Sequence, residues 1–115
     1  MAAKLAVVVR ADLGMGRGKI AAQAAHAAVA AALSSQGTPE FAAWLRDGQV
    51  KLVLRADSEA DLLDLVTSAR SAGLPVEVIC DAGRTQVEPG TLTSAAIGPA
   101  EASQVDAITG TLRLL

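Results

Sequence analysis

The chain has 115 residues, 51% of them hydrophobic, which is enough for one domain (residues 1–115) with a core of its own. Its 10 basic and 12 acidic side chains give a net charge of −2, so no overall positive field attracts nucleic acid. The single cysteine, Cys80, excludes an internal disulfide, and no apolar stretch is long enough to span a bilayer. These features are typical of a cytoplasmic globular protein.

The first half of the chain alternates strand and helix patterns. Lys4–Arg10 is a continuous apolar run rich in valine, which predicts a strand buried on both faces. A glycine-rich loop follows, and an alanine-rich helix is predicted from about Lys19 to Leu33. Thr38 and Pro39 indicate the start of a short helix that ends near Asp47.

The second half continues this alternation. The remaining strands are predicted at Gln49–Ala56, at Val76–Cys80 and, as a short fourth strand, at Ser94–Gly98. Ser58 is the expected N-cap of a third helix, which closes near Arg70. Pro99 is expected to open a last helix that ends at Gly110, and residues 111–115 form either an edge strand or a tail.

Strands that alternate with helices predict a single three-layer α/β/α domain. Its sheet is expected to be mixed and mostly parallel, with about four strands and with helices on both faces. Ligands of such sheets bind beyond the carboxyl ends of the strands. The loops Ala11–Gly18 and Asp81–Thr93 follow strand ends and hold the unusual residues. If the strands before these loops are neighbours in the sheet, Asp81 lies near Lys19.

The glycines within residues 14–18 match neither of the common nucleotide-binding motifs. A Walker loop requires a glycine where the chain has Leu13 and a serine or threonine where it has Ile20. A dinucleotide fingerprint requires a third glycine where Lys19 stands. The loop can instead bring backbone amides to an anion at the helix N-terminus, beside Arg17 and Lys19. The alternative is a flexible turn with solvated cations.

Few polar side chains interrupt the alanine-rich helix. Lys19, Gln23 and His26 are spaced four and three residues apart, which places them on one face. The position of Lys19 at the N-terminus of the helix, beside the glycines, favours a functional role for this residue. Gln23 and His26 are equally compatible with a partly buried hydrogen-bonded pair.

The loop after the third strand is polar although it follows a buried strand. Asp81 begins it, and threonines and an arginine follow. Such loops often carry sites, but aspartate and threonine also form and cap turns. A cluster of lysine, aspartate and threonine can orient a water and stabilise an oxyanion without a metal or cofactor.

Three stretches of the chain resemble the archaeal- and eukaryotic-type peptidyl-tRNA hydrolases. They are VVVRADLGMGRGKIAAQAAHAAV, DAGRTQVEPGTLTSAAIGP and ITGTLRLL. The resemblance covers Lys4–Leu115 and implies cleavage of the ester that joins a peptide to the terminal ribose of tRNA, which recycles tRNA from stalled translation. It further implies a homodimer that needs no cofactor or metal.

The resemblance also assigns roles by matching position. The implied catalytic group is Lys19, Asp81, Thr85 and Thr93, and Asp81 serves as base, as orienter of the water or as counter-ion of Lys19. The expected substrate-binding residues are Gly16, Arg17, Gly18, Gln23 and Arg84, with His26 behind the site. Gly14 and Arg17 stand where the family commonly has lysine. The one positive charge that is lost, at Gly14, weakens the expected contact with tRNA without altering the chemistry. A non-catalytic tRNA- or phosphate-binding module and a structural dimerisation domain are the alternatives.

Overall fold

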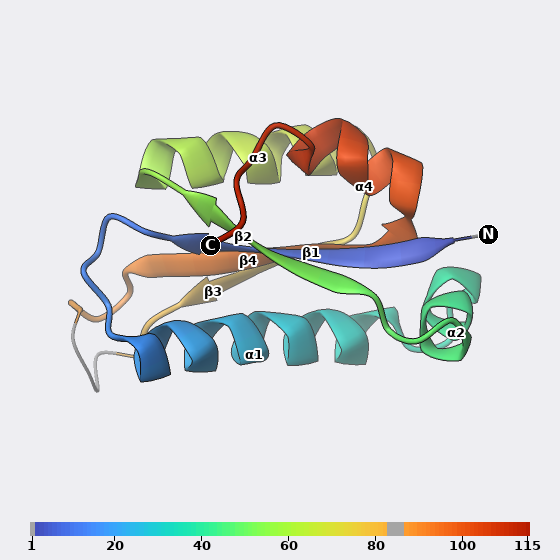
Figure 1. Ribbon diagram of the computed structural model, residues 1–115, viewed down its shortest axis with the longest axis horizontal. Coiled ribbons are helices and arrows are strands. Elements are labelled where there is room, and N and C mark those ends of the chain that lie inside the picture. Colours follow the sequence, from blue (N-terminus) through green and yellow to red (C-terminus); the bar gives the residue numbers. More distant parts are fainter. Residues whose placement is uncertain (1, 83–86) are drawn as a thin grey trace.

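The computed structural model describes residues 2–82 and 87–115, which form a four-stranded sheet covered by helices (Figure 1). Along the chain the elements are β1 (Ala3–Arg10), α1 (Arg17–Ser35), α2 (Pro39–Arg46), β2 (Lys51–Ala56), α3 (Glu59–Ser71), β3 (Val76–Cys80), β4 (Leu92–Glu101) and α4 (Ala102–Thr109). α1 and α2 cover one face of the sheet, and α3 and α4 cover the other. The predicted α/β domain with helices on both faces is confirmed. Within the described residues no helix is long and apolar enough to cross a membrane.

The sheet is mixed, and its strand order is β2-β1-β4-β3. β1 and β2 are parallel, whereas β4 runs against both of its neighbours, β1 and β3. Three strands therefore point the same way, but two of the three pairings are antiparallel because β4 lies between β1 and β3. The expectation that the two strands before the candidate loops are neighbours is wrong, since β4 separates them.

β1 lies in the middle of the sheet, and its side chains fill the cores on both faces. Leu5 and Val7 pack in the cluster under α1 and α2, whereas Val8 packs in the cluster under α3 and α4. This alternation is the two-residue period of a strand, and it explains why the segment is apolar throughout. Ala27 and Ala31 of α1 are buried against the sheet. Their small side chains let the helix backbone approach the strands closely.

β4 is longer than predicted, and Pro99 lies inside it instead of opening the last helix. The pairing of β4 with β1 shifts register between Lys4 and Ala6, opposite Gly98 and Pro99. Proline is tolerated at such an irregularity because no ladder hydrogen bond needs its missing N–H. Gly98 has a φ of 109°, and a Cβ there would lie 2.6 Å from the Lys4 carbonyl oxygen, so this position requires glycine. The last helix begins only at Ala102.

Local signals at the helix starts are confirmed. The side chains of Thr38 and Ser58 accept hydrogen bonds from backbone N–H groups in the first turns of α2 and α3. The C-terminal segment, left open between strand and tail, pairs with β2 through an antiparallel bridge between Leu114 and Leu54. It thereby covers part of the open edge of the sheet.

Candidate active site

β1 and β3 end at the same edge of the sheet, at the left of Figure 1. A nearly buried ion pair of Lys19 and Asp81 lies just beyond these strand ends. Lys19 stands in the first turn of α1, and its Nζ donates a hydrogen bond to Asp81 Oδ1. Asp81 directly follows β3, and its backbone N–H donates to the Thr91 carbonyl oxygen at 2.8 Å. Its own carbonyl oxygen accepts from the Gly90 N–H at the same distance. The backbone therefore fixes the aspartate, and the helix start brings the lysine to it.

Burial distinguishes this pair from an ordinary surface salt bridge. The Lys19 side chain is 9% exposed and the Asp81 side chain 3%. Removing two charges from water costs desolvation energy, which their attraction offsets only in good geometry, so such a pair contributes little to stability. In a site with little water, however, the same charges act strongly on a bound substrate. A buried, paired charge at the end of a sheet is therefore typical of a functional site.

A buried hydrogen-bond network continues from this pair along α1. Gln23, one turn after Lys19, is buried, and its Oε1 accepts a hydrogen bond from the Thr93 hydroxyl. Its backbone carbonyl accepts from the Ser94 hydroxyl at 3.2 Å. Thr93 and Ser94 are both completely buried at the start of β4. The side chain and the backbone of Gln23 are thus both held by β4.

The amide nitrogen of Gln23 points out of this network. It makes no hydrogen bond with the described residues. An amide donor of fixed orientation lies one helical turn from the Lys19 ammonium.

The start of α1 adds positive potential beside the pair. Gly16 is the N-cap and provides no side-chain cap, and the first turn contains no acidic residue. Arg17 and Gly18 are exposed there, and a Cβ at Gly18 would meet no atom within 4 Å. The helix N-terminus, the Arg17 guanidinium and open space around the backbone suit an approaching anion.

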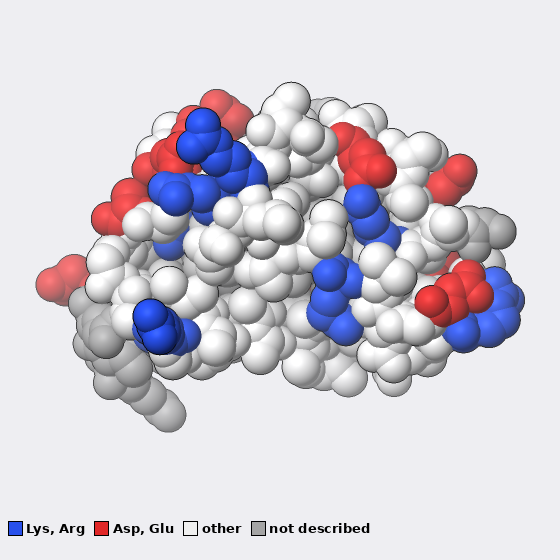
Figure 2. All heavy atoms as spheres, viewed as in Figure 1, with Lys and Arg blue, Asp and Glu red and all other residues white. Residues whose placement is uncertain are grey.

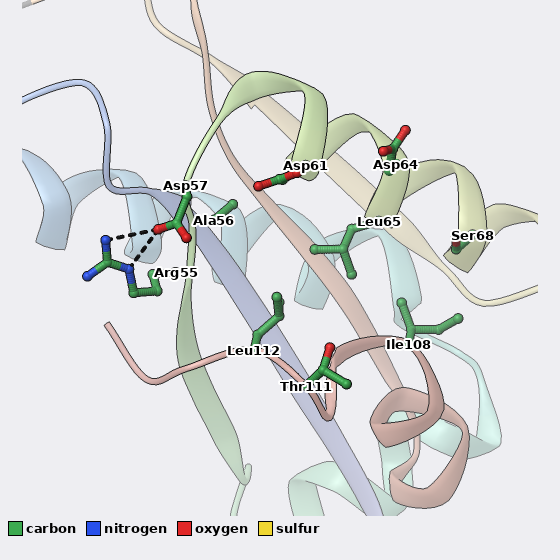
Figure 3. Close-up of a pocket in the computed structure, with 10 residues that line it drawn as sticks. All are labelled: Arg55, Ala56, Asp57, Asp61, Asp64, Leu65, Ser68, Ile108, Thr111 and Leu112. Atoms are coloured by element: carbon green, nitrogen blue, oxygen red, sulfur yellow. Dashed lines mark hydrogen bonds and ion pairs between the residues drawn. The ribbon is translucent and has the colours of Figure 1, made fainter.

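A second hollow, on the other face of the sheet, has the opposite charge. It lies between the end of β2, α3 and the C-terminal segment, and Asp57, Asp61 and Asp64 line its polar side (Figure 3). Arg55 is turned to Asp57 by hydrogen bonds of 3.1 and 2.9 Å. Acidic side chains also gather over the start of α3 in the space-filling view (Figure 2). This lining repels phosphate groups, so the hollow is no candidate for binding an anionic substrate.

Comparisons with known proteins decide the family. The profile of the family described as "Peptidyl-tRNA hydrolase PTH2" matches residues 3–115. A "Peptidyl-tRNA hydrolase" of Methanocaldococcus jannaschii is 51% identical over 114 residues, which cover 97% of this chain and 99% of that protein. The chain belongs to the peptidyl-tRNA hydrolase PTH2 family. Proteins of the same name from Metallosphaera sedula and Aeropyrum pernix are 53% and 52% identical, over 97% and 96% of this chain and 99% and 94% of their own lengths.

Within this PTH2 chain the structure brings together four of the residues expected at the site. They are Lys19, Gln23, Asp81 and Thr93. Thr93 is completely buried, and its hydroxyl donates to Gln23 Oε1 and faces the Ile79 carbonyl oxygen. The expected residues Arg84 and Thr85 lie outside the described part of the chain.

His26 departs from both readings of the helix stripe. It is exposed, so it neither pairs with the buried Gln23 nor packs behind the site. Positions 23 and 26 differ by about 60° around the helix, and this difference leaves His26 in solvent while Gln23 is buried. Among residues 2–82 and 87–115 no group of three or more His, Cys, Asp or Glu side chains is placed to hold a metal ion.

From the sequence, Arg10 has no role beyond ending the first strand. The structure buries it and pairs it with Asp12. The signal that could have found it is the triplet Arg10-Ala11-Asp12 at the end of a buried strand, which places a carboxylate within reach of the guanidinium.

Proposed function

We propose that the ion pair of Lys19 and Asp81 is where this peptidyl-tRNA hydrolase cleaves the ester between the peptide and the 3′-terminal ribose of tRNA. The observation that carries the proposal is a nearly buried ammonium–carboxylate pair at a helix start whose first turn contains no acidic residue. Ester hydrolysis needs an oriented water and a positive group near the carbonyl oxygen. The pair supplies both.

In the proposed mechanism the Asp81 carboxylate accepts a hydrogen bond from the attacking water and takes its proton. The water oxygen bonds to the ester carbon, and the Lys19 ammonium stabilises the negative charge that develops on the former carbonyl oxygen. As the tetrahedral intermediate collapses, the bond to the ribose oxygen breaks and Asp81 returns the proton to that oxygen. The products are a peptide with a free carboxylate and a tRNA with a free terminal hydroxyl.

Gln23 assists as a substrate-binding residue through its amide nitrogen, which makes no hydrogen bond with the described residues. An N–H donor one turn from Lys19 is placed to bind the peptide carbonyl or the terminal ribose. Thr93 then acts through Gln23, because its hydroxyl holds the amide oxygen and so fixes the orientation of the amide. Thr85 as a catalytic residue and Arg84 as a substrate contact stay predictions of the family resemblance.

The start of α1 binds the terminal phosphates of tRNA in this proposal. Gly18 offers backbone that a phosphate can approach, because a Cβ there would meet no atom within 4 Å, and Arg17 offers an exposed charge. Gly16 as a phosphate contact stays a prediction of the family resemblance. The rest of α1 carries no charged residue up to Ser35. The phosphate contact is therefore confined to one end of the helix.

A release assay tests the proposed function. Purified protein is incubated with peptidyl-tRNA labelled in the peptide, and free peptide and intact tRNA are measured over time. Multiple turnovers by the wild-type protein and their loss in Lys19→Ala are expected. A protein that binds tRNA but releases no peptide would instead be a non-catalytic tRNA-binding module.

We further propose a homodimer that works in the cytoplasm, where tRNA is recycled. Val29 and Leu33 on the outer face of α1 are 57% and 63% exposed and have no charged neighbours on the helix. A second copy of the chain would remove this apolar surface from water. Light scattering at tens of micromolar is expected to give the mass of a dimer, and Val29→Lys is expected to shift it toward the monomer.

A further inference from the structure

Arg10 is a buried cation that the proposed reaction does not use. It ends β1, and its side chain is only 9% exposed. Its Nε and Nη2 donate to the two carboxylate oxygens of Asp12 at 3.0 and 2.7 Å. Its Nη1 donates to the Leu92 carbonyl oxygen at 3.1 Å and lies 3.8 Å from a carboxylate oxygen of Glu59. One side chain thus joins the β1–α1 loop, the start of β4 and the start of α3.

The first of these contacts fixes the loop that leads to Lys19. Asp12 lies in this loop between the end of β1 and the start of α1. Met15 anchors the same loop from the opposite side, because it is buried in the cluster under α1. With Arg10 at one end and Met15 at the other, the loop has a fixed course into the first turn of the helix.

The second contact fixes the strand start that supports Asp81. Leu92 is the first residue of β4 and pairs with Cys80, the residue before Asp81. The pairing of β4 with β1 ends at Ser94 and Val9, so beyond that point the Arg10 side chain continues the link between the strands. Arg10 therefore holds both structures that carry the Lys19–Asp81 pair.

The Arg10 guanidinium is suited to holding the β1–α1 loop and β4 together. It is poorly placed to bind a phosphate, because its donors already face Asp12 and the Leu92 carbonyl oxygen. Its hydrogen bond to Asp12 raises the pKa of Arg10, and the same bond lowers the pKa of Asp12, so both stay charged near neutral pH. A guanidinium offers donors in a rigid plane, and a lysine ammonium cannot reproduce the fork on Asp12 and the bond to Leu92 together.

The chain contains a matched control for this arrangement. Arg55, Ala56 and Asp57 repeat the triplet Arg-Ala-Asp at the end of β2. Arg55 also donates from Nε and Nη2 to its aspartate, but both bonds go to one oxygen, Asp57 Oδ1, whereas Arg10 bonds both oxygens of Asp12. The two side chains of this second pair are 44% and 73% exposed, however, and their hydrogen bonds join no other element within the described residues. The second pair therefore has the same local chemistry without the links to β4 and α3.

We propose that Arg10 is a positioning residue of the hydrolysis. It sets where the β1–α1 loop and the start of β4 lie, and through them the distance between the Lys19 ammonium and the Asp81 carboxylate, without contacting the substrate. The inference rests on the proposed function, because it assumes that this pair is the catalytic centre. Displacements of about 1 Å in such a site are enough to reduce the rate up to about a hundredfold.

Steady-state kinetics of Arg10→Lys and Arg55→Lys test the proposal. Arg10→Lys is expected to lower kcat about ten- to a hundredfold with KM and the salt dependence of tRNA binding unchanged, and Arg55→Lys to match the wild type. Equal kcat in the two variants would overturn the proposal. A higher KM with a weaker salt dependence in Arg10→Lys would also overturn it, because Arg10 would then contact phosphate.

Two further variants separate positioning from folding and from failure of the proposed function. Asp12→Asn keeps the bond from Arg10 to Leu92 and is expected to lower kcat less than Arg10→Lys, with the double variant close to Arg10→Lys alone. A rate that falls only in proportion to the folded fraction, measured by circular dichroism, would contradict positioning. Lys19→Ala provides the other control. If Lys19→Ala retains the full rate, the proposed function fails. If Lys19→Ala is inactive but Arg10→Lys is fully active, the proposed function stands and only the role of Arg10 is refuted.

Discussion

Lys19 and Asp81 are 62 residues apart in the chain, yet the Lys19 ammonium donates a hydrogen bond to the Asp81 carboxylate. The strands that precede them, β1 and β3, are separated by β4. Both strands run antiparallel to β4 and therefore end at the same edge of the sheet. α1 then turns back over this edge from the end of β1. The start of the helix, and not strand pairing, brings the lysine to the aspartate.

Removal of either partner of this pair is expected to lower kcat about a hundred- to a thousandfold, with a smaller effect on KM, because each group acts mainly in the transition state. Lys19→Ala, Asp81→Ala and the double variant are compared by steady-state kinetics, and the two losses are not expected to add. Lys4 is the matched control, since it pairs with Asp106 at the other end of β1. If Lys4→Ala loses as much rate as Lys19→Ala, the pair has no special role.

Thr93→Val is expected to lower kcat about tenfold, because the valine keeps the shape but no longer holds the Gln23 amide oxygen. The lost hydrogen bond also costs about 1 kcal/mol of unfolding free energy. Thr93→Ser restores the hydroxyl and is expected to restore most of the rate. Denaturant unfolding and kinetics on both variants check this, and a serine variant as slow as the valine one would contradict the role of the hydroxyl.

Arg17→Ala is expected to weaken tRNA binding and to reduce its salt dependence. Each phosphate contact contributes about 0.7 to 0.9 to the slope of log K against log salt. Arg46 serves as the control, because it is also exposed but lies at the end of α2, next to Asp47. Binding is measured by filter retention at several salt concentrations. An unchanged slope in Arg17→Ala would remove this residue from the contact surface.

His26→Ala is expected to change neither stability nor kcat appreciably. The imidazole is exposed, and it makes no hydrogen bond or ion pair with the described residues. Thermal unfolding and kinetics are compared with those of Gln23→Ala, which removes a buried, bonded side chain on the same helix and is expected to lower both. A folded His26→Ala that loses more rate than Lys19→Ala would identify a histidine base in place of the lysine pair.

The stability contribution of Asp12 is expected to disappear in acid. The hydrogen bond from Arg10 holds the pKa of Asp12 below its ordinary value, so the folded state binds this proton less readily than the unfolded state. The contribution is therefore fully present above the ordinary pKa of the carboxyl and is lost as the pH falls through the lowered value. Asp12→Asn should be less stable than the wild type at pH 7, and the difference should shrink as the pH falls below the ordinary pKa of the carboxyl. A difference that is constant with pH would contradict this assignment.

The sequence by itself determined the elements whose signals are local. The valine run of β1, the caps at Thr38 and Ser58 and the apolar stripe of α3 require only neighbours within a few residues. The sequence also identified Lys19 and Asp81 as candidate site residues, because Lys19 stands at the start of a helix and Asp81 follows a buried strand. The family resemblance rested on the same stretches.

The tertiary structure decided everything that depends on which strands are neighbours. β4 lies between β1 and β3. Pro99, which was expected to start a helix, is therefore part of this strand and lies at an irregularity in its pairing with β1. The same arrangement buries Thr93 against α1, where its hydroxyl holds the Gln23 side chain.

The two Arg-Ala-Asp triplets show why local sequence was insufficient. Arg10 pairs in register with Ala56, whose side chain packs under α3. Arg55 pairs in register with Val9, whose side chain packs under α1. Because successive side chains of a strand point to opposite faces, this offset of one residue places the two arginines on opposite faces of the sheet. β1 is central and β2 is at the edge, so Arg10 is buried between β4 and α3 while Arg55 stays in solvent. Identical triplets acquired different roles because burial depends on the neighbours that the fold supplies.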